Sequence, residues 1–309
     1  MPNIKIYYGK SAKHWNDGID KLVISSFSNG ETRIELKEAV RGDRTIIIQT
    51  FTNNVNAEIM ETMLIMDTLR RAGATEITLV LPMFPYARQD RKHMRGVPIS
   101  AKVICDMFSS YADQIITFDL HSNQIQGFTN TNIIENLSFF PFISSVMLQQ
   151  DINLEDTTII SPDVGSTNRA IELSRMLKIK DIAVFYKRRE NGNIKDIKLL
   201  GNIDTSTCLI IDDMVDTGGT LIKCGEILQD YCKDIYVMTS HLILSGDIRK
   251  LSIFKKVIGM DSVPIAKMKL FDSNIFRIGF AEYFNNYLYP ILERKSQFFP
   301  LYNPNYFLK

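Results

Sequence analysis

An apolar strand that leads through two acids into a glycine turn and a helix constrains this chain more than any other stretch. Cys208–Ile211 is typical of a buried strand, and Asp212 and Asp213 follow it directly. Asp216–Thr220, with the sequence DTGGT, comes next and leads into a helix expected to start near Leu221. Glycines let a backbone approach an anion closely, and the N–H groups of a turn and a helix N-terminus bind phosphate. The stretch therefore predicts a phosphate-binding loop at the carboxyl end of a strand, where open α/β sheets bind ligands.

The two acids beside this loop indicate what else the ligand carries. Carboxylates repel phosphate, but they can hold ribose hydroxyls or a divalent cation. The alternative is an ordinary strand followed by an acidic turn. We prefer the ligand-binding interpretation because the acids, glycines and threonines all lie at the spacings that a phosphate-binding loop needs. The stretch Cys208–Leu221 resembles the loop that binds phosphoribosyl pyrophosphate (PRPP) in type I phosphoribosyltransferases and in ribose-phosphate pyrophosphokinases.

The composition is that of a globular protein with two domains of ordinary size. The chain has 309 residues, of which 45% are apolar and 23% charged. The net charge of +1 argues against a nucleic-acid or membrane partner. No apolar run approaches the roughly 18 residues of a transmembrane helix, and the N-terminal sequence has no signal-peptide pattern. Four cysteines without C-x-x-C spacing are expected to be reduced, packed thiols in a cytoplasmic protein.

Strands and helices alternate along the chain, which predicts an α/β fold of largely parallel sheets flanked by helices. In the first half we expect strands at 4–8, 45–50, 77–81 and 115–120. We expect helices at 57–71, from 98 with Ser100 as N-cap, and at 140–150. The second half repeats the pattern, with strands at 158–161, 182–186, 208–211, 235–238 and near 257 and 276, and a helix at 167–177. We therefore predict two similar domains, 1–145 and 146–285, and a tail, 286–309. The tail is rich in aromatic residues and prolines, so we expect it to pack on a protein surface.

A cation-rich segment follows the strand at 77–81. Its cations are Arg88, Arg91, Lys92, His93 and Arg95. A solvated face or a nucleic-acid patch fits poorly with a net charge near zero, so a polyanion such as a nucleoside triphosphate is the better prediction. The neighbouring aromatic side chains of Phe84 and Tyr86 either pack in the core or flank a base.

Three other segments carry polar or charged residues, and two of them admit two interpretations each. Val23–Leu36 is predicted to be a hairpin around a turn at 28–30 and, by itself, suggests nothing more. Asp119 and His121 lie two apart at the end of a strand, so they are either structural or share one metal ion. Lys187–Arg189, before the turn residues Asn191 and Gly192, form either a solvated hairpin or a lid that brings charge to a reaction.

Eight motifs occur in the order found in ribose-phosphate pyrophosphokinases, and the resemblance covers residues 1 to about 285. They are FSNGE (27–31), FPYARQDRK (84–92), PISAK (98–102), DLHSNQIQGF (119–128), SPDVGS (161–166), YKRR (186–189), IIDDMVDTGGTL (210–221) and SHLILSG (240–246). The second and fourth motifs are not features of simple phosphoribosyltransferases, so the chain is identified as a member of the pyrophosphokinase family.

The resemblance implies a transfer of the diphosphoryl group of Mg-ATP to the 1-hydroxyl of ribose 5-phosphate, giving PRPP and AMP for nucleotide biosynthesis. It implies Mg²⁺ as cofactor and a homo-oligomer built from dimers, with a hexamer known in the family. The hairpin at 27–31 would reach the nucleotide site of a neighbouring subunit.

The resemblance also implies roles for individual residues. ATP would be bound by Phe27, Asn29, Glu31, Arg88, Gln89, Asp90 and Arg91. Ribose 5-phosphate would be bound by Arg189, Asp212, Asp213, Asp216, Thr217, Gly218, Gly219 and Thr220. Lys187 and Arg189 would be catalytic, and His121, Asp163 and Asp119 would lie at the metal.

The chain departs from the family pattern in several places. Ser166 stands where a second glycine is usual, Asn130 where an acid is common, and Val55–Glu58 differs from the usual Asn-Asp pair. The tail is longer than the family's short ending. Two other functions remain as alternatives: a non-catalytic regulatory subunit of the same fold, and a phosphoribosyltransferase that consumes PRPP. Dependence on ATP distinguishes both from a synthetase.

Overall fold

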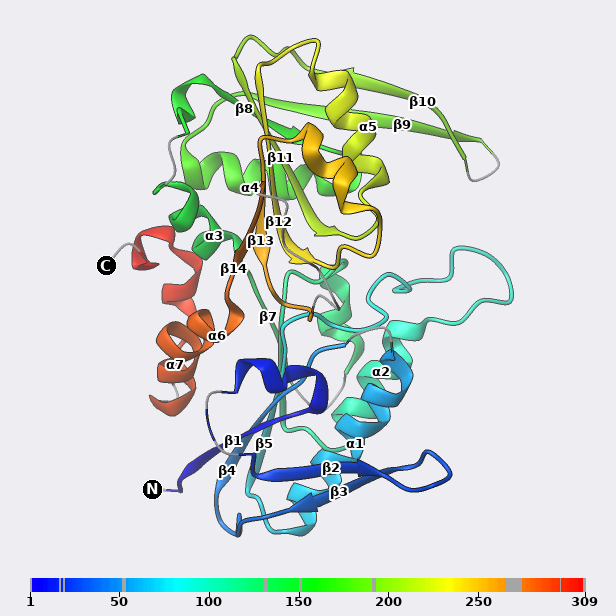
Figure 1. The fold of residues 1–309 in the computed structure, drawn as a ribbon, viewed down its shortest axis with the longest axis vertical. Helices are drawn as coiled ribbons and strands as arrows, with labels where there is room; N and C mark the ends of the chain where they lie inside the picture. Colours follow the sequence, from blue (N-terminus) through cyan, green and yellow to red (C-terminus); the bar gives the residue numbers. More distant parts are fainter. Residues whose placement is uncertain are drawn as a thin grey trace. The chain divides into compact units, whose positions relative to one another are not determined.

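Two parallel β-sheets organise the chain (Figure 1). The computed structural model describes residues 2–16, 18, 20–51, 54–129, 133–149, 152–190, 193–264, 274–294 and 296–307, without the side chains of 187–190, 193–196 and 299. Contacts divide the chain into two compact units. Unit 1 comprises Met1–Leu137, Ser262–Ala266 and Phe280–Gln297, and unit 2 comprises Ser138–Asp261, Lys267–Gly279 and Phe298–Lys309.

Unit 1 contains a five-stranded parallel sheet with the order β1-β4-β5-β6-β7. Its strands are β1 (Ile4–Tyr8), β4 (Arg44–Ile48), β5 (Glu76–Leu81), β6 (Gln114–Phe118) and β7 (Ile133–Leu137). A separate antiparallel hairpin is formed by β2 (Leu22–Ser26) and β3 (Thr32–Leu36). Helix α1 (Val55–Arg71) packs on β3 and β5, and α2 (Ser100–Ser109) packs on the 3-10 helix η2 (Asn123–Phe128). The buried runs of β4 and β5 form the centre of the core.

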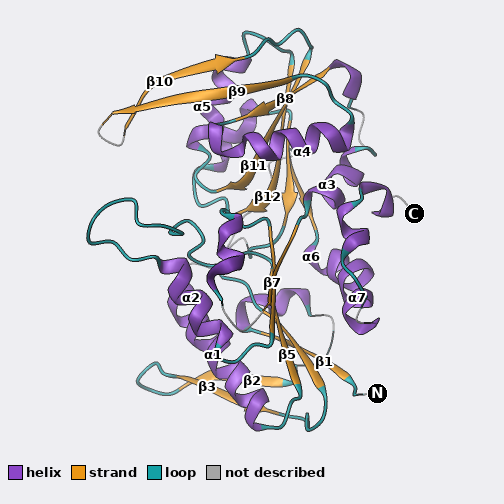
Figure 2. Cartoon of the chain, turned by 180° about the vertical axis from the view of Figure 1, so that it is seen from behind, coloured by secondary structure: helices purple, strands orange, loops and turns teal. Residues whose placement is uncertain are grey.

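Unit 2 contains a seven-stranded sheet with the order β10-β9-β8-β11-β12-β13-β14, in which only the β9–β10 pair is antiparallel. Its strands are β8 (Thr157–Ser161), β9 (Ile182–Glu190), β10 (Asn193–Leu200), β11 (Thr207–Val215), β12 (Asp234–Leu242), β13 (Lys256–Met260) and β14 (Ile275–Ile278). Helix α4 (Thr167–Leu177) packs on β8, β9 and β11, α3 (Phe140–Met147) on β12 and β13, and α5 (Gly219–Leu228) on β11, as Figure 2 lets the reader follow. The predicted fold class is confirmed.

The C-terminal helical segment returns to unit 1 after β14. It consists of α6 (Phe280–Tyr283), a π-helical turn (Phe284–Leu288) and α7 (Tyr289–Arg294). Phe280 lies 4.7 Å from Trp15 between ring centroids, and Tyr283 lies 5.6 Å from Phe118. The compact units therefore differ from the consecutive segments 1–145, 146–285 and 286–309, because aromatic packing assigns Phe280–Gln297 to the first sheet's unit.

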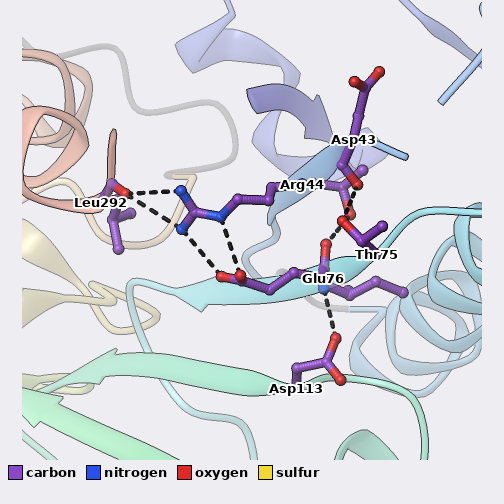
Figure 3. Close-up of polar contacts among 8 residues, drawn as sticks. Asp43, Arg44, Thr75, Glu76, Asp113 and Leu292 are labelled. Atoms are coloured by element: carbon purple, nitrogen blue, oxygen red, sulfur yellow. Dashed lines mark hydrogen bonds and ion pairs between the residues drawn. The ribbon is translucent and has the colours of Figure 1, made fainter. Parts of the chain in front are cut away.

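Arg44, at the start of β4, anchors this C-terminal segment (Figure 3). Its Nε and Nη2 donate to the two carboxylate oxygens of Glu76, each at 3.0 Å. The same guanidinium donates to the carbonyl of Leu292 in α7, at 3.4 Å and 3.3 Å. The guanidinium thus binds one carboxylate through two hydrogen bonds. It also donates to one of the last carbonyls of α7, which have no partner inside the helix.

Several local predictions change in the structure. Ser100 is the first residue of α2 and not its N-cap, which is Ile99. Strand β9 continues to Glu190, four residues beyond the predicted end at 186, so Lys187–Arg189 lie on the strand. The four cysteines are buried free thiols, as predicted. Within the described part of the chain, no helix is both long enough and apolar enough to cross a membrane.

Candidate active site

The predicted phosphate loop has the expected strand–turn–helix geometry. Strand β11 runs through Val215, and Asp216–Gly218 connect it to α5, which begins at Gly219. Gly218 is the N-cap of α5 and has φ of 74°, a left-handed conformation that favours glycine. The first N–H groups of α5 have no partner inside the helix, so this end of the helix suits an anion. We call residues Asp212–Thr220 the cradle.

Asp212 and Asp213 lie within β11 rather than after it. Asp213 is buried, and the Oδ1 atom of Asp212 accepts hydrogen bonds from the Asp213 N–H at 2.9 Å and from Ser166 Oγ at 3.1 Å. Burial and the negative charges of Asp213 and Asp163 raise the pKa of Asp212 to about 7. Three carboxylates thus share one negatively charged region of unit 2.

Ser166 links two of these carboxylates. Its backbone N–H donates to Asp163 Oδ1 at 3.1 Å, while its hydroxyl donates to Asp212. The residue that departs from the family's glycine therefore adds a side-chain hydrogen bond that glycine cannot make.

Arg169 is a residue that the sequence analysis missed. It lies in the first turn of α4, and its Nη2 is 3.8 Å from Asp213 Oδ2. Its position three residues after Ser166 was the available signal, because the first turn of a helix that follows a strand-end loop lies beside that loop. Arg169 supplies positive charge to the acids of the cradle.

The predicted catalytic cations lie on β9. The backbones of Lys187 and Arg189 pair with Ile197 and Ile194 of β10. The β9–β10 hairpin extends beyond the rest of its sheet in Figure 1. The turn residues Asn191 and Gly192 and the side chains of both cations lie outside the described part, so their catalytic roles stay predictions.

In unit 1, the cation-rich segment follows β5 as predicted and is exposed. We call residues Tyr86–Pro98 the basic loop. Arg88, Gln89 and Arg91 are exposed and Asp90 is half-buried. Gln89 is tied to the start of α2, since its side-chain oxygen accepts from the hydroxyl of Ser100.

Tyr86, at the start of the basic loop, has φ of 58°. Its hydroxyl donates to Asn56 Oδ1 of α1 at 2.5 Å. Positive φ in a bulky residue is a sparsely populated conformation that surrounding contacts must hold, and such residues cluster at functional sites. Phe84, by contrast, is buried and packs on Phe108, so of the two aromatic residues Phe84 belongs to the core.

The hairpin at 27–31 joins β2 to β3 and exposes its apolar tip. Phe27 is 53% exposed. The turn is closed by Phe27 N–H donating to the Glu31 carbonyl at 2.8 Å, and Gly30 N–H donating to the Phe27 carbonyl at 2.9 Å. Asn29 Oδ1 accepts from the Glu31 N–H at 3.2 Å. An exposed phenylalanine at the end of a well-formed hairpin is available to a ligand or a second subunit.

The predicted metal-binding residues belong to both units. Asp119 and His121 follow β6 in unit 1, and Asp163 follows β8 in unit 2. Asp119 has φ of 44°, so the argument that an extended strand turns Asp119 and His121 to one side is wrong. Among the described residues, no three His, Cys, Asp or Glu side chains form a metal-binding group.

The oxygen donors of unit 2 fit Mg²⁺. Magnesium prefers a few carboxylate oxygens together with water and phosphate oxygens. The mutual repulsion that raises the pKa of Asp212 beside Asp213 and Asp163 is of the kind that a divalent cation relieves. His121 is the member of the predicted set that fits magnesium least well, because imidazole suits transition metals better.

Comparisons with known proteins match both halves of the chain. Residues 10–111 match the family described as the N-terminal domain of ribose phosphate pyrophosphokinase. Residues 142–266 match the family described as the phosphoribosyl transferase domain.

Full-length relatives are also similar. A ribose-phosphate pyrophosphokinase of Buchnera aphidicola is 36% identical over 282 residues, covering 86% of this chain and 89% of the relative. The protein of the same name from Vibrio cholerae is 37% identical with the same coverage. The crystal structure of phosphoribosylpyrophosphate synthetase from Mycobacterium smegmatis superposes with a TM-score of 0.84 at 28% identity, covering 94% of this chain and 99% of that one.

Proposed function

This chain belongs to the ribose-phosphate pyrophosphokinase family, and we propose that it transfers the diphosphoryl group of ATP to the 1-hydroxyl of ribose 5-phosphate. The products are PRPP and AMP. Both family halves are present in order, and so are the two motifs that simple phosphoribosyltransferases lack, at 84–92 and 119–128.

The observation that carries the proposal is the cradle itself. A buried strand bearing Asp212 and Asp213 leads through a left-handed Gly218 into the N-terminus of α5. The helix end suits the 5-phosphate, and the carboxylates suit the ribose hydroxyls. A ligand that is both phosphate and sugar fits this combination, whereas a simple anion does not explain the acids.

ATP is assigned to unit 1. The exposed Arg88, Gln89 and Arg91 of the basic loop offer charge and hydrogen bonds to a triphosphate. The hairpin carrying Phe27, Asn29 and Glu31 offers an aromatic face to a base. We propose that it does so in a homo-oligomer, across a subunit boundary, and the exposure of Phe27 supports this assignment.

The reaction is a substitution at the β-phosphorus of ATP. The 1-hydroxyl oxygen of the ribose forms a bond to that phosphorus, and the hydroxyl proton leaves. The bond from the β-phosphorus to the oxygen bridging to the α-phosphate breaks, and AMP departs with its electron pair. Such a transfer needs alignment and charge neutralisation more than covalent help. Lys187, Arg189 and Arg88 are assigned to neutralise the charge that develops on the phosphates.

Mg²⁺ is the proposed cofactor. Asp119, His121 and Asp163 are its predicted ligands. When bound, it supplies positive charge to the phosphate oxygens. The four buried, free thiols support the further proposal of a reducing, cytoplasmic location.

An AMP-release assay tests the proposed function. Purified protein is incubated with Mg²⁺ and ATP, with and without ribose 5-phosphate, and with and without inorganic phosphate. We expect AMP only when ribose 5-phosphate is present. AMP formation that is independent of the sugar, or no AMP under any condition, would contradict the proposal. The response to phosphate would show whether inorganic phosphate activates the enzyme.

A further inference from the structure

The loop that follows β12 contacts the cradle at successive residues. Ile243–Gly246 lie directly after β12, the strand that pairs in parallel with β11. The N–H groups of Ile243 and Leu244 both donate to the carbonyl of Val215, at 2.9 Å each. Val215 is the last residue of β11 before the turn of the cradle. The loop is thus fixed to the point where the cradle begins.

Leu244 shows that this attachment holds the loop in an unusual conformation. Its φ is 54°, and its side chain is buried. A leucine in the left-handed conformation is strained, and it persists only where surrounding contacts hold it there. Here the paired hydrogen bonds and the buried side chain do so. They turn the chain so that the next two residues meet Asp216 and Thr217.

Ser245 acts on the side chain of Asp216. Its hydroxyl donates a hydrogen bond to Asp216 Oδ1. A carboxylate that is half-buried on a turn has several rotamers, and a hydrogen bond to one oxygen selects among them. Ser245 therefore sets the orientation of an acid that belongs to the cradle.

Gly246 acts on the backbone of Thr217. A Cβ atom at position 246 would lie 2.5 Å from the Thr217 carbonyl oxygen and 2.8 Å from its Cα. Because these are backbone atoms, no side-chain rotation can relieve such contacts. Glycine at 246 allows the two backbones to lie against each other, and any other residue would displace the turn of the cradle.

We propose that Ile243–Gly246 is a positioning element for the cradle, in which Ser245 orients Asp216 and Gly246 fixes the backbone of Thr217 for binding of ribose 5-phosphate. This inference rests on the proposed function. Neither residue is assigned to contact the substrate. Each acts through the cradle residue that it touches, so its loss is felt in the binding of the sugar phosphate and not in the binding of ATP.

Kinetics of Ser245→Ala, Ser245→Thr and Gly246→Ala test the proposal, together with calorimetric binding of ribose 5-phosphate. Ser245→Ala is expected to raise the KM for ribose 5-phosphate about 5- to 20-fold, near the lower limit for a hydrogen bond to a charged group because Ser245 is exposed. The KM for ATP stays within about twofold, because ATP does not bind the cradle. Ser245→Thr keeps the hydroxyl and restores the affinity. Gly246→Ala has the larger effect, on the order of 100-fold, because it displaces backbone.

Ser206→Ala is the matched control. Ser206 precedes β11 at its amino end, and its hydroxyl donates to the exposed carboxylate of Asp156 in the same way. The Ser206→Ala substitution therefore removes a hydrogen bond between a serine hydroxyl and a carboxylate at the amino end of β11, the end opposite the cradle. Its KM for ribose 5-phosphate should equal that of the wild type.

The outcomes separate this inference from the proposed function. An active wild-type chain whose Ser245→Ala variant has unchanged KM and unchanged affinity for ribose 5-phosphate overturns the inference and leaves the function standing. A wild-type chain that binds ribose 5-phosphate without releasing AMP overturns the function, and the calorimetric ratio between wild type and Ser245→Ala then decides the inference alone. If Gly246→Ala does not fold, the Ser245 variants still decide it.

Discussion

The cradle of unit 2 and the basic loop of unit 1 are built in opposite ways. The cradle is held by neighbours at almost every step, through Ser166, Arg169 and the loop Ile243–Gly246. The basic loop is exposed along most of its length, and the side-chain hydrogen bonds that attach it lie near its start, at Tyr86 and Gln89.

The difference follows from how each region is expected to bind. The cradle offers backbone N–H groups and short carboxylates, which act only if their positions are fixed before the ligand arrives. Arginine and lysine side chains are long, so they reach a polyphosphate from a loop that is not itself fixed. Changes in the cradle should therefore affect folding stability and sugar binding together, and changes among the cations should affect catalysis or ATP binding alone.

Lys187→Ala should have the largest effect. Loss of a cation that stabilises the transition state is expected to cut turnover at least about a hundredfold, with the affinity for ATP nearly kept. Lys198→Ala, on the partner strand β10 of the same hairpin, is the control and should be close to wild type. Steady-state kinetics measure both. A wild-type rate in Lys187→Ala would remove Lys187 from the mechanism.

Asp212→Asn should separate stability from activity in the cradle. Asparagine keeps the Oδ1 acceptor for Ser166 and for the N–H of Asp213 but removes the charge. Because the pKa of Asp212 is raised to about 7, native protein binds this proton more tightly than unfolded protein, so wild-type stability falls as the pH rises from about 4 to 7. The variant should therefore gain stability over wild type, by about 1–3 kcal/mol more at pH 8 than at pH 5, while losing sugar binding.

Urea unfolding at the two pH values measures this difference. Asp156→Asn is the control, because the pKa of Asp156 is shifted in the opposite direction to that of Asp212. Hydrogen bonds from the Ser206 hydroxyl and N–H lower the pKa of Asp156, so its loss cannot stabilise the protein and should have the same effect at pH 5 and pH 8. A gain for Asp212→Asn that does not change with pH would contradict the assigned charge repulsion.

Arg88→Ala should behave in the opposite way to the cradle variant. The side chain is exposed, so the melting temperature should stay at the wild-type value. The KM for ATP is expected to rise about tenfold, the effect of one lost charge-assisted hydrogen bond. Arg33→Ala, at an exposed arginine of β3, should change neither quantity. A large loss of stability in Arg88→Ala would break the comparison between the two regions.

Arg44→Ala should affect stability without affecting catalysis. Its side chain is 13% exposed and bridges Glu76 and the Leu292 carbonyl (Figure 3). We expect a loss of about 1–2 kcal/mol in urea unfolding, because the partly buried acceptors lose their donor. Arg71→Ala is the matched control. Arg71 pairs with Asp67 at 79% exposure, so its loss should destabilise the protein much less than the loss of Arg44. Equal losses in the two variants would show that the anchor has no special role.

Much of the fold was predictable because its signals are local. Apolar runs mark β4, β5, β8 and β11, and the prediction of α4 at 167–177 matches the structure residue for residue. The length of β9 was not predictable, because Lys187–Glu190 are polar and their strand pairing depends on β10. The unusual backbone of Asp119 was missed for a related reason. Nothing in Asp-Leu-His signals a positive φ, and tertiary contacts impose it.

By itself, the sequence determined the family, the α/β class and the order of the strands, acids and glycines that make the cradle. Those features depend on local periodicity and on residue types that only certain turns accept. Only the tertiary structure decided which distant residues meet the cradle. The sequence does not show that Arg169 pairs with Asp213 or Ser245 with Asp216. These residues meet because parallel strands bring the carboxyl ends of β8, β11 and β12 to one edge of the sheet. The raised pKa of Asp212 has the same origin, since it requires burial and a charge from Asp163, forty-nine positions earlier in the chain.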